Sequence, residues 1–452
     1  MKRTQRCILV WSGSPQLLNH GDITMLQVTV RRLRRLCPQH RILVFVDSGD
    51  LLERYCPGAE PLDKVTFDLR QCRLLAPESI LRIAPNSAQA WVREKQTQLL
   101  ARSSTTYRLV TRAKARLKGN GAGDPKAAFE LLAHTDAIVS TGGGFVNDSF
   151  PSVAQRVMRD LKLGASLSIP VAMFGQGLGP VTNAGVLQSA GELFPTLAVI
   201  GLREGRQSYG LAARWAGGVS PRIRVTGDDA IEPVYSLHRP EWGESIGVNV
   251  RVANYSGVDR YQVLHLAEVL RSAAAMTKAP LLPIVISRHP DESDAENLRA
   301  LLSDGQLLSS EADYDTPEKA VSAVARCRVV VTGSYHAGVF ALAQGIPVIG
   351  LVADKYYEAK FLGLSHQFGC GVEMVWLDRQ DFGSQLLRLI RAMWDAAPTF
   401  REQLLSSARD QIELGERAYA DFAAVVQQKA AGGLNSSNST DRTRIGLSAS
   451  RL

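Results

Sequence analysis

Short apolar runs recur along the chain, each followed by a Gly-rich turn and then by an amphipathic stretch of helical length. Apolar runs that alternate with helices are typical of parallel strands whose two faces are both covered by helices. The pattern therefore predicts an α/β fold built on parallel sheets. The predicted strands are Cys7–Trp11, Arg41–Val46, Ala137–Ser140, Pro170–Phe174, Leu197–Leu202, Ile223–Val225, Ile246–Val250, Leu281–Ile286, Val329–Val331 and Pro347–Leu351.

The predicted strands fall into two sets on either side of a linker at Pro240–Trp242. We expect two Rossmann-like, doubly wound halves, residues 1–238 and 245–425, that face each other across a cleft. A chain of 452 residues exceeds the roughly 100–200 residues of one ordinary domain, which agrees with this division. Ligands of such folds bind outside the carboxyl ends of the strands, so functional residues are expected in the turns that follow them.

Two segments depart from the strand–helix pattern. Residues 430–452 are rich in Gly, Ser and Asn, which predicts a disordered tail. Residues 69–120 form a basic insert without a clear strand. Within it, residues 69–118 carry eleven Lys or Arg and two Glu, so this segment accounts for the net charge of +8 and the remaining chain is close to neutral. This distribution disfavours a nucleic-acid-binding protein. The insert is either an ordinary solvated face or a surface attracted to anionic lipid head groups or to the pyrophosphate of a lipid-linked sugar.

Cysteine usage and hydropathy bear on the compartment. The six cysteines form neither a CxxC pair nor a dense framework, which favours unpaired thiols in a reducing cytoplasm and disfavours a structural zinc site. The apolar run at Cys7–Trp11 is too short for the core of a signal peptide, and no window reaches the roughly 20 apolar residues of a membrane span. We expect a cytoplasmic protein, with peripheral contact at the inner face of the membrane as the alternative.

Two glycine-rich turns follow predicted strands. The backbone N–H groups of Gly142, Gly143 and Gly144 are expected to face a phosphate or carboxylate, with tight strand–helix packing as the alternative. The second turn, at 175–180, has the spacing GxGxGP, which is not the dinucleotide-binding fingerprint. We therefore predict no nicotinamide cofactor, and expect this turn, with Gln176, to line the cleft.

Two arginines end predicted strands. The planar guanidinium of Arg203 suits a carboxylate or phosphate in the ligand crevice, although a salt bridge with Glu204 is the alternative. Arg206, three residues later, is assigned to the surface. The same argument applies to Arg251 at the start of the second half.

The turn at Asn19–Asp22 lies between the first predicted strand and an amphipathic helix. Asp22 is suited to cap that helix, and Gly21 allows the turn to approach a ligand closely. A capped turn without a ligand is an equally good interpretation of these residues.

The most informative turn precedes the helix predicted to start at His336. At a helix N-terminus, the dipole lowers the pKa of a histidine and orients the ring toward an anion. Beside Ser334 and Tyr335, this histidine is interpreted as a ligand contact or acid/base residue, with a buried structural histidine as the alternative. Lys360, beyond the next predicted strand, would complete a cationic pocket.

Together these motifs resemble those of the polysaccharide pyruvyl transferase family. The resemblance covers about residues 7–370 and rests on the order of six motifs: Asn-x-Gly-Asp at 19–22, GGG at 142–144, GQGLGP at 175–180, the helix start at 203–208, GVNVR at 247–251 and SYHAGVFALAQGIPVIGL at 334–351. It implies a GT-B-like fold. It also implies an enzyme that transfers pyruvate from phosphoenolpyruvate to two hydroxyls of a sugar, forming a cyclic ketal on a bacterial surface polysaccharide or its lipid-linked precursor.

The resemblance also implies roles for individual residues. His336 is the general acid, and Asp22 is a base or an acceptor-orienting group. No cofactor or metal is implied. The donor-binding residues would be Arg203, Arg251, Lys360, Ser334, Gly142, Gly143 and Gly144, and the acceptor-binding residues Asn19 and Gln176.

One position departs from the family pattern. Ser334 stands two residues before the histidine, where members of the family commonly have an arginine. Either Lys360, Arg288 or the basic insert supplies the missing cation, or the donor is not phosphoenolpyruvate. A nucleotide-sugar glycosyltransferase and a non-catalytic member of a polysaccharide-assembly complex are the two competing functions.

Overall fold

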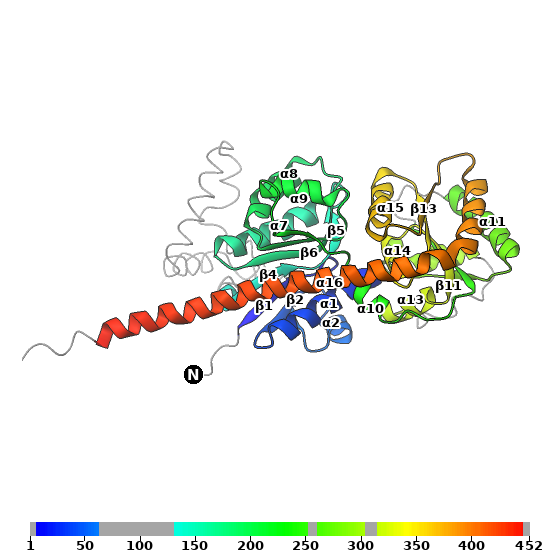
Figure 1. The fold of residues 1–452 in the computed structure, drawn as a ribbon. Coiled ribbons are helices and arrows are strands. Elements are labelled where there is room, and N and C mark those ends of the chain that lie inside the picture. The colour runs from blue at the N-terminus through cyan, green and yellow to red at the C-terminus, as the bar shows by residue number, and fades with distance from the viewer. Residues whose placement is uncertain (1–5, 63–130, 252–259, 303–313, 446–452) are drawn as a thin grey trace, which may run out of the picture.

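The computed structural model describes residues 6–62, 131–251, 260–302 and 314–445 (Figure 1). The basic insert at 69–120 lies outside the described residues. Two α/β halves lie side by side, and one long C-terminal helix crosses both of them (Figure 1). Within the described residues, no helix combines the length and apolar character needed to cross a membrane.

The N-terminal half contains a parallel sheet with the strand order β3-β2-β1-β4-β6-β7-β8, to which β5 adds by pairing with β6. Because the order reverses between β1 and β4, the sheet is doubly wound, and its crevice lies beside the ends of these strands. The strands are β1 (Cys7–Trp11), β2 (Arg41–Phe45), β3 (Glu60–Leu62), β4 (Thr135–Ser140), β5 (Gly143–Val146), β6 (Val171–Leu178), β7 (Val199–Leu202) and β8 (Ile223–Val225).

The C-terminal half repeats this architecture with a parallel sheet in the order β10-β9-β11-β12-β13. The predicted fold class, two Rossmann-like halves, is therefore confirmed. The strands are β9 (Ser245–Asn249), β10 (Leu281–Pro283), β11 (Cys327–Thr332), β12 (Val348–Val352) and β13 (Val372–Trp376).

Helices cover both faces of each sheet (Figure 1). In the N-terminal half they are α1 (His20–Leu36), α2 (Gly49–Tyr55), α7 (Pro151–Ser166), α8 (Ala184–Leu193), α9 (Ser208–Ala216) and α10 (Ile231–Tyr235), with a 3₁₀ turn at Phe194–Thr196. In the C-terminal half they are α11 (Arg260–Thr277), α12 (Asp294–Leu302), α13 (Pro317–Val324), α14 (Tyr335–Leu342), α15 (Lys355–Phe368) and α16 (Phe382–Ile445), with a 3₁₀ turn at Pro290–Glu292.

The helix α16 starts in the C-terminal half and crosses onto the N-terminal one (Figure 1). Leu404 and Ala408 pack into the core of the C-terminal half, whereas Tyr419 and Phe422 are fully buried against the N-terminal sheet. The ring of Tyr419 stacks on Phe174 of β6 with 3.7 Å between the ring centroids. The segment expected to end the second half at 425 thus belongs to the core of the first. The helix also continues to Ile445, through much of the tail predicted to be disordered, while residues 446–452 lie outside the described residues.

The two halves are also joined at the segment that leads into α1. The N–H of His20 donates to the carbonyl of Ile286 at 2.9 Å, and the N–H of Arg288 donates to the carbonyl of Leu18 at 2.8 Å. These bonds flank an isolated antiparallel bridge between Asn19 and Ser287. The first turn of α1 is therefore fixed to the C-terminal half.

Two glycine-rich segments differ from the prediction. The strand β6 continues through Gln176 to Leu178, so most of the GQGLGP motif is a strand and not a turn. Gly143 and Gly144 likewise begin the short strand β5, which pairs with β6. Both segments are extended because their backbone N–H and C=O groups pair with a neighbouring strand. The spacing of glycines in the sequence does not reveal this pairing between distant segments.

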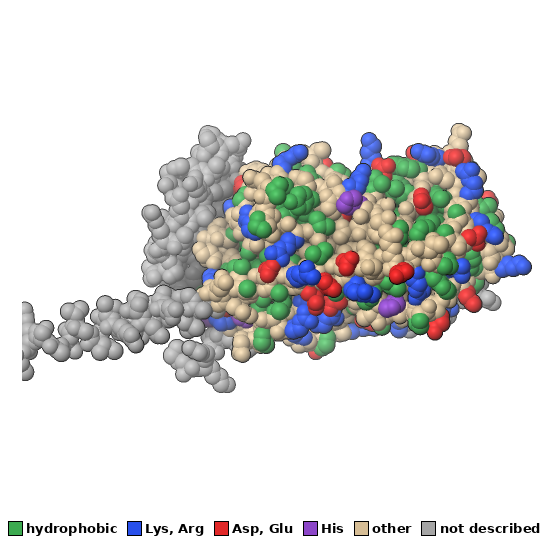
Figure 2. Space-filling view, in the orientation of Figure 1, with side chains coloured by type: hydrophobic (Ala, Val, Ile, Leu, Met, Phe, Trp, Pro, Cys, Tyr) green, Lys and Arg blue, Asp and Glu red, His purple; other side chains and the backbone are tan. Residues whose placement is uncertain are grey.

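Charged side chains are interspersed on the face that α16 crosses (Figure 2). Arg35 and Glu416 form one such exposed pair, with 2.8 Å between guanidinium nitrogen and carboxylate oxygen. Exposed pairs of this kind contribute little to stability. The attachment of α16 to the N-terminal half must therefore depend on buried contacts.

We predict that Phe422→Ala lowers the free energy of unfolding by about 3–5 kcal/mol, because it leaves a cavity beneath α16 where the ring now meets Phe174 edge-on. Urea unfolding followed by circular dichroism measures the change. The matched control is Val425→Ala on the same helix, a side chain that is 37% exposed and whose truncation should change stability by less than about 0.5 kcal/mol. Equal effects of the two substitutions would contradict this account of the packing.

Candidate functional site

Side chains from both halves meet where the strands β1, β7, β8, β9, β11 and β12 end. Each belongs to a post-strand turn or to the first part of the helix that follows, which is the position expected for ligand-binding residues in doubly wound folds. The charges of these side chains act on one another across the space between the halves. The residues are Asp22, Arg203, Asp228, Arg251, His336 and Lys360.

His336 lies directly against the backbone of α1. A Cβ atom on Gly21 would be 2.0 Å from Cγ of the imidazole, so only glycine leaves room for this ring. Asn19, and not Asp22, caps the helix: its Oδ1 accepts from the N–H groups of Gly21 at 3.0 Å and Asp22 at 3.3 Å. Asp22 is left with its carboxylate in the first turn of α1, where burial raises its pKa and the nearby site cations oppose that rise.

Arg203 is held by glycines and by one aromatic ring. Its guanidinium carbon lies 3.8 Å from the centroid of Tyr335. A Cβ atom on Gly144 would be 2.7 Å from Nη2, and one on Gly177 would be 2.4 Å from Nε. The predicted alternative, a salt bridge with Glu204, is not formed, because that carboxylate instead accepts from Gln207 and Ser208 at the start of α9.

Lys360 is the second cation of the site. Its ammonium lies 3.8 Å from the ring centroid of Tyr356. The hydroxyl of Tyr356 donates to the carbonyl of Gly144 at 3.3 Å and accepts from Asn147 at 3.2 Å, which connects the two halves above the cations. Among the described residues, neither Arg203 nor Lys360 has a carboxylate oxygen within ion-pair distance.

These cations border a small hollow between the halves, with walls from both of them. Burial lowers the pKa of Lys360 well below its ordinary value, and repulsion from Arg203 and Arg251 lowers it further. A bound anion would relieve this repulsion. The lining residues are Gly144, Gly177, Leu178, Gly179, Arg203, Glu204, Gln207, Tyr335, Tyr356, Ala359 and Lys360.

Arg251 occupies a different environment from the other two cations. Its Nη1 lies 3.3 Å from Glu292, and its Nε lies 3.6 Å from Asp294, so its charge is partly compensated. It also lies against the turn that carries Ser334, because a Cβ atom on Gly333 would be 3.2 Å from the Arg251 backbone nitrogen. The Arg251 backbone thus lies beside the turn where the family commonly has an arginine, and its charge acts on His336 and Lys360.

An acid and a base face each other in the centre of the site. Nε2 of His336 lies 3.8 Å from Oδ2 of Asp228, and among the described residues neither atom has a partner in hydrogen-bond geometry. Burial lowers the pKa of His336 well below its ordinary value, and the neighbouring cations add to the effect. Burial raises the pKa of Asp228 to about 7, with Arg203 opposing the rise. Near neutral pH, His336 is therefore uncharged and Asp228 retains a proton for much of the time.

The sequence analysis did not identify Asp228 as a site residue, although its position after a predicted strand could have indicated it. It follows the predicted strand at Ile223–Val225, in a turn that contains Gly227 and a second acid, Asp229. This is the same type of position that drew attention to Arg203. Burial also raises the pKa of Asp22, to about 6, against the opposing effect of the cations.

The other predicted site residues lie around this centre, where they pack or form hydrogen bonds within the fold. The side-chain amide of Gln176 is fully buried and donates to the carbonyls of Thr141 and Phe174, so it has no surface to offer a sugar. Asn19 is committed to the α1 cap. Gly142 packs against Gly175, and a Cβ atom on it would be 2.8 Å from the Gly175 carbonyl oxygen. Ser334 is buried at the start of α14.

Arg288 lies apart from the site, where Nη2 donates to the hydroxyl of Tyr55 at 2.9 Å. It is therefore not the cation that replaces the family arginine. Among the described residues, no group of three or more His, Cys, Asp or Glu side chains is arranged to hold a metal ion.

The fold and the site define a two-domain α/β protein with a cationic cleft and a central acid–base pair. A profile of the polysaccharide pyruvyl transferase family matches residues 19–355, most of the chain. The chain therefore belongs to the polysaccharide pyruvyl transferase family. This match spans every residue of the site except Lys360. No curated protein sequence matches the chain significantly.

Solved structures with similar folds differ widely in sequence. The chain is similar to a UDP-GlcNAc 2-epimerase from Neisseria meningitidis bound to UDP-GlcNAc, with 11% identity, a TM-score of 0.50, and coverage of 94% of this chain and 99% of the other. It is also similar to the glycotransferase of kitacinnamycin, with 13% identity, a TM-score of 0.49, and coverage of 95% and 99%. At such low identity, the epimerase supports the two-domain fold alone.

We predict that the imidazole of His336 stays uncharged down to pH values well below 6.5 and that Arg203→Gln raises its pKa, because the substitution removes the strongest cationic influence on the ring. Long-range ¹H–¹⁵N spectra of the full chain labelled at histidine measure this titration. Arg206→Gln removes an exposed cation three residues away and should leave the curve unchanged. A His336 that titrates near 6.5 in the unsubstituted chain would contradict the electrostatic description.

Proposed function

We propose that this protein transfers pyruvate from phosphoenolpyruvate to two hydroxyls of a sugar, forming a cyclic ketal on a surface polysaccharide or its lipid-linked precursor. The observation that carries the proposal is a pair of cations, the buried Arg203 and the partly buried Lys360, in the same site as a proton-holding acid. Among the described residues, neither cation has a carboxylate oxygen within ion-pair distance. Membership of the polysaccharide pyruvyl transferase family supports it.

Phosphoenolpyruvate is chemically suited to this cleft. It carries a carboxylate and a phosphate, so it brings the negative charge that cations at the site require. Arg203 offers a planar fork to one anionic group, and Lys360 offers a point charge to the other. Arg251 is the candidate for the cation that an arginine at the Ser334 position would otherwise provide, because its charge acts on His336 and Lys360 even though Glu292 and Asp294 partly compensate it.

The acid–base pair is suited to the first chemical step. Ketal formation starts when the methylene carbon of phosphoenolpyruvate takes a proton and becomes a methyl group, which leaves positive charge on the neighbouring carbon. We assign this proton to Asp228 and His336 together: the carboxyl of Asp228 holds it near neutral pH, and the uncharged ring of His336 passes it on. Binding of the donor anion would also raise the pKa of His336 by offsetting the neighbouring cations.

The remaining steps balance the protons and bonds. One sugar hydroxyl attacks the cationic carbon, phosphate leaves, and a second hydroxyl closes the ring. The two hydroxyls release two protons, of which one restores the acid and the other leaves with phosphate. Asp22, in the first turn of α1, is the candidate to accept a hydroxyl proton, because its raised pKa matches that task.

The acceptor and the cellular site belong to the same proposal. A sugar on a lipid carrier would bring the reaction to the inner face of the membrane, where the basic insert could contact anionic head groups. We propose a cytoplasmic enzyme of bacterial polysaccharide assembly with this peripheral contact.

We predict that phosphoenolpyruvate raises the melting temperature of the protein by several degrees, since a ligand at about 100 times its Kd stabilises the folded state by about 2.7 kcal/mol. Arg203→Gln and Lys360→Met should abolish the shift, while the surface variant Arg206→Gln retains it. Differential scanning fluorimetry measures all four proteins. A shift with uridine nucleotides and none with phosphoenolpyruvate would replace the proposal with a nucleotide-sugar transferase.

We also predict that turnover in D₂O places one deuterium in the methyl group of each ketal, because the third methyl hydrogen comes from the exchangeable proton of the acid. Mass spectrometry of the product counts it. Asp228→Asn should lower kcat by about 100-fold, since general acid catalysis typically contributes a factor of this order or more. An Asp228→Asn enzyme with unchanged kcat would remove this residue from the mechanism.

A further inference from the structure

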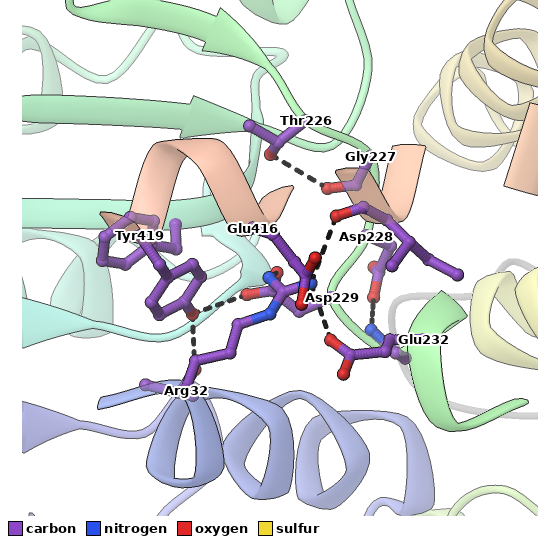
Figure 3. Close-up of polar contacts among 12 residues, drawn as sticks. Arg32, Thr226, Gly227, Asp228, Asp229, Glu232, Glu416 and Tyr419 are labelled. Atoms are coloured by element: carbon purple, nitrogen blue, oxygen red, sulfur yellow. Dashed lines mark hydrogen bonds and ion pairs between the residues drawn. The ribbon is translucent and has the colours of Figure 1, made fainter. Parts of the chain in front are cut away.

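A buried polar cluster joins α16 to the turn that carries Asp228 (Figure 3). Nη1 of Arg32, on α1, donates to Oδ1 of Asp229 at 2.9 Å. The hydroxyl of Tyr419, on α16, donates to Oδ2 of the same carboxylate at 2.8 Å. Both carboxylate oxygens of Asp229 are thus bound by elements that lie far apart in the sequence.

This cluster is well packed and shielded from water. Arg32 is 2% exposed and its second nitrogen, Nη2, pairs with Glu232 at 2.7 Å. Burial raises the pKa of Tyr419 well above its ordinary value, so its hydroxyl remains a donor across the working pH range. Removing one partner from such a network leaves a buried charge less well compensated.

Two glycines bring α16 unusually close to the turn. Gly227 has a φ of +77°, and a Cβ atom there would lie 2.4 Å from Oε1 of Gln411. A Cβ atom on Gly415 would lie 2.9 Å from Nη1 of Arg32. The helix therefore contacts Gly227, which precedes Asp228, and also Arg32, which pairs with Asp229.

The neighbouring carboxyl of Asp228 points the other way, into the site. Its Oδ1 accepts from the N–H of Ala230 at 2.9 Å, and its Oδ2 faces His336. Its position depends on the turn between Gly227 and Ala230, which the bonds to Asp229 hold in place. We propose that Tyr419 and Arg32 are positioning residues that hold the Asp228 carboxyl toward His336, so that α16 is part of the proton-transfer apparatus.

The groups that face Asp228 define the expected effect on its titration. They are Asp22 from α1, Arg203 from the end of β7, Asp229 from the same turn, and Tyr335 and His336 from α14. Of these, Asp229 is the group that hydrogen-bonds to α16. Burial raises the pKa of Asp229, whereas Arg32 and Tyr419 oppose that rise and so favour its charged form. Negative charge on Asp229 in turn helps Asp228 to keep its proton.

The test is Tyr419→Phe in the full chain. The substitution removes the hydroxyl and keeps the ring that stacks on Phe174, so the fold is retained. We expect the carboxyl of Asp228, followed by ¹³C NMR in the unliganded protein, to titrate at lower pH than in the unsubstituted chain. In turnover we expect kcat to fall about tenfold, the size associated with losing a hydrogen bond to a charged group, with KM for phosphoenolpyruvate unchanged and the alkaline limb of the kcat profile moved to lower pH.

Thr29→Val is the matched control. The hydroxyl of Thr29 lies 2.8 Å from that of Tyr419, so this variant removes a hydrogen bond of the tyrosine while leaving its bond to Asp229 intact. It should titrate and turn over as the unsubstituted chain does. An unchanged Asp228 titration in Tyr419→Phe overturns the inference, even if that variant is less stable. Equal changes in Thr29→Val overturn it too.

The effect on kcat rests on the proposed function, whereas the titration does not. If the unsubstituted chain fails to turn over phosphoenolpyruvate, the proposed function fails alone. The ¹³C titration of Tyr419→Phe then decides whether α16 positions the Asp228 carboxyl.

Discussion

The organisation of the cleft depends on repulsion between cations held in one low-dielectric space. Arg203 and Lys360 come from different halves, and neither is neutralised by a carboxylate among the described residues. Burial lowers the pKa of His336 and their field lowers it further, while the same field limits how far burial can raise the pKa values of Asp22 and Asp228. The protonation states of the site therefore depend on burial and on charges that a bound anion would offset. Occupation of the cleft would change its acid–base properties as well as its electrostatic energy.

Close backbone approach is the second requirement of this arrangement. Gly144 and Gly177 make room for the guanidinium of Arg203, and Gly21 makes room for the ring of His336. The glycine-rich motifs thus leave room for side chains of the protein itself. We had expected their N–H groups to bind an anion instead. A substitution at any of the three would displace a charged or titratable group without removing it.

The sequence predicted this site unevenly, for physical reasons. Parallel strands bring their carboxyl ends to one edge, so Arg203 and His336 could be found from local patterns alone. Asp228 could have been found in the same way. The positions of Gln176 and Tyr419 could not, because each depends on contacts between distant segments. The buried amide of Gln176 bonds to the backbone of Thr141, and Tyr419 lies on a helix that returns to Asp229, 190 positions earlier in the chain.

The antiparallel bridge between Asn19 and Ser287 has a consequence for motion. Because it fixes the start of α1 to the C-terminal half, a hinge at the linker alone cannot separate the two halves as rigid bodies. The relative orientation of Asp22, Gly21 and His336 is thus established when the chain folds. The conformational entropy of aligning them is lost once, during folding, and does not reduce the free energy of each binding event.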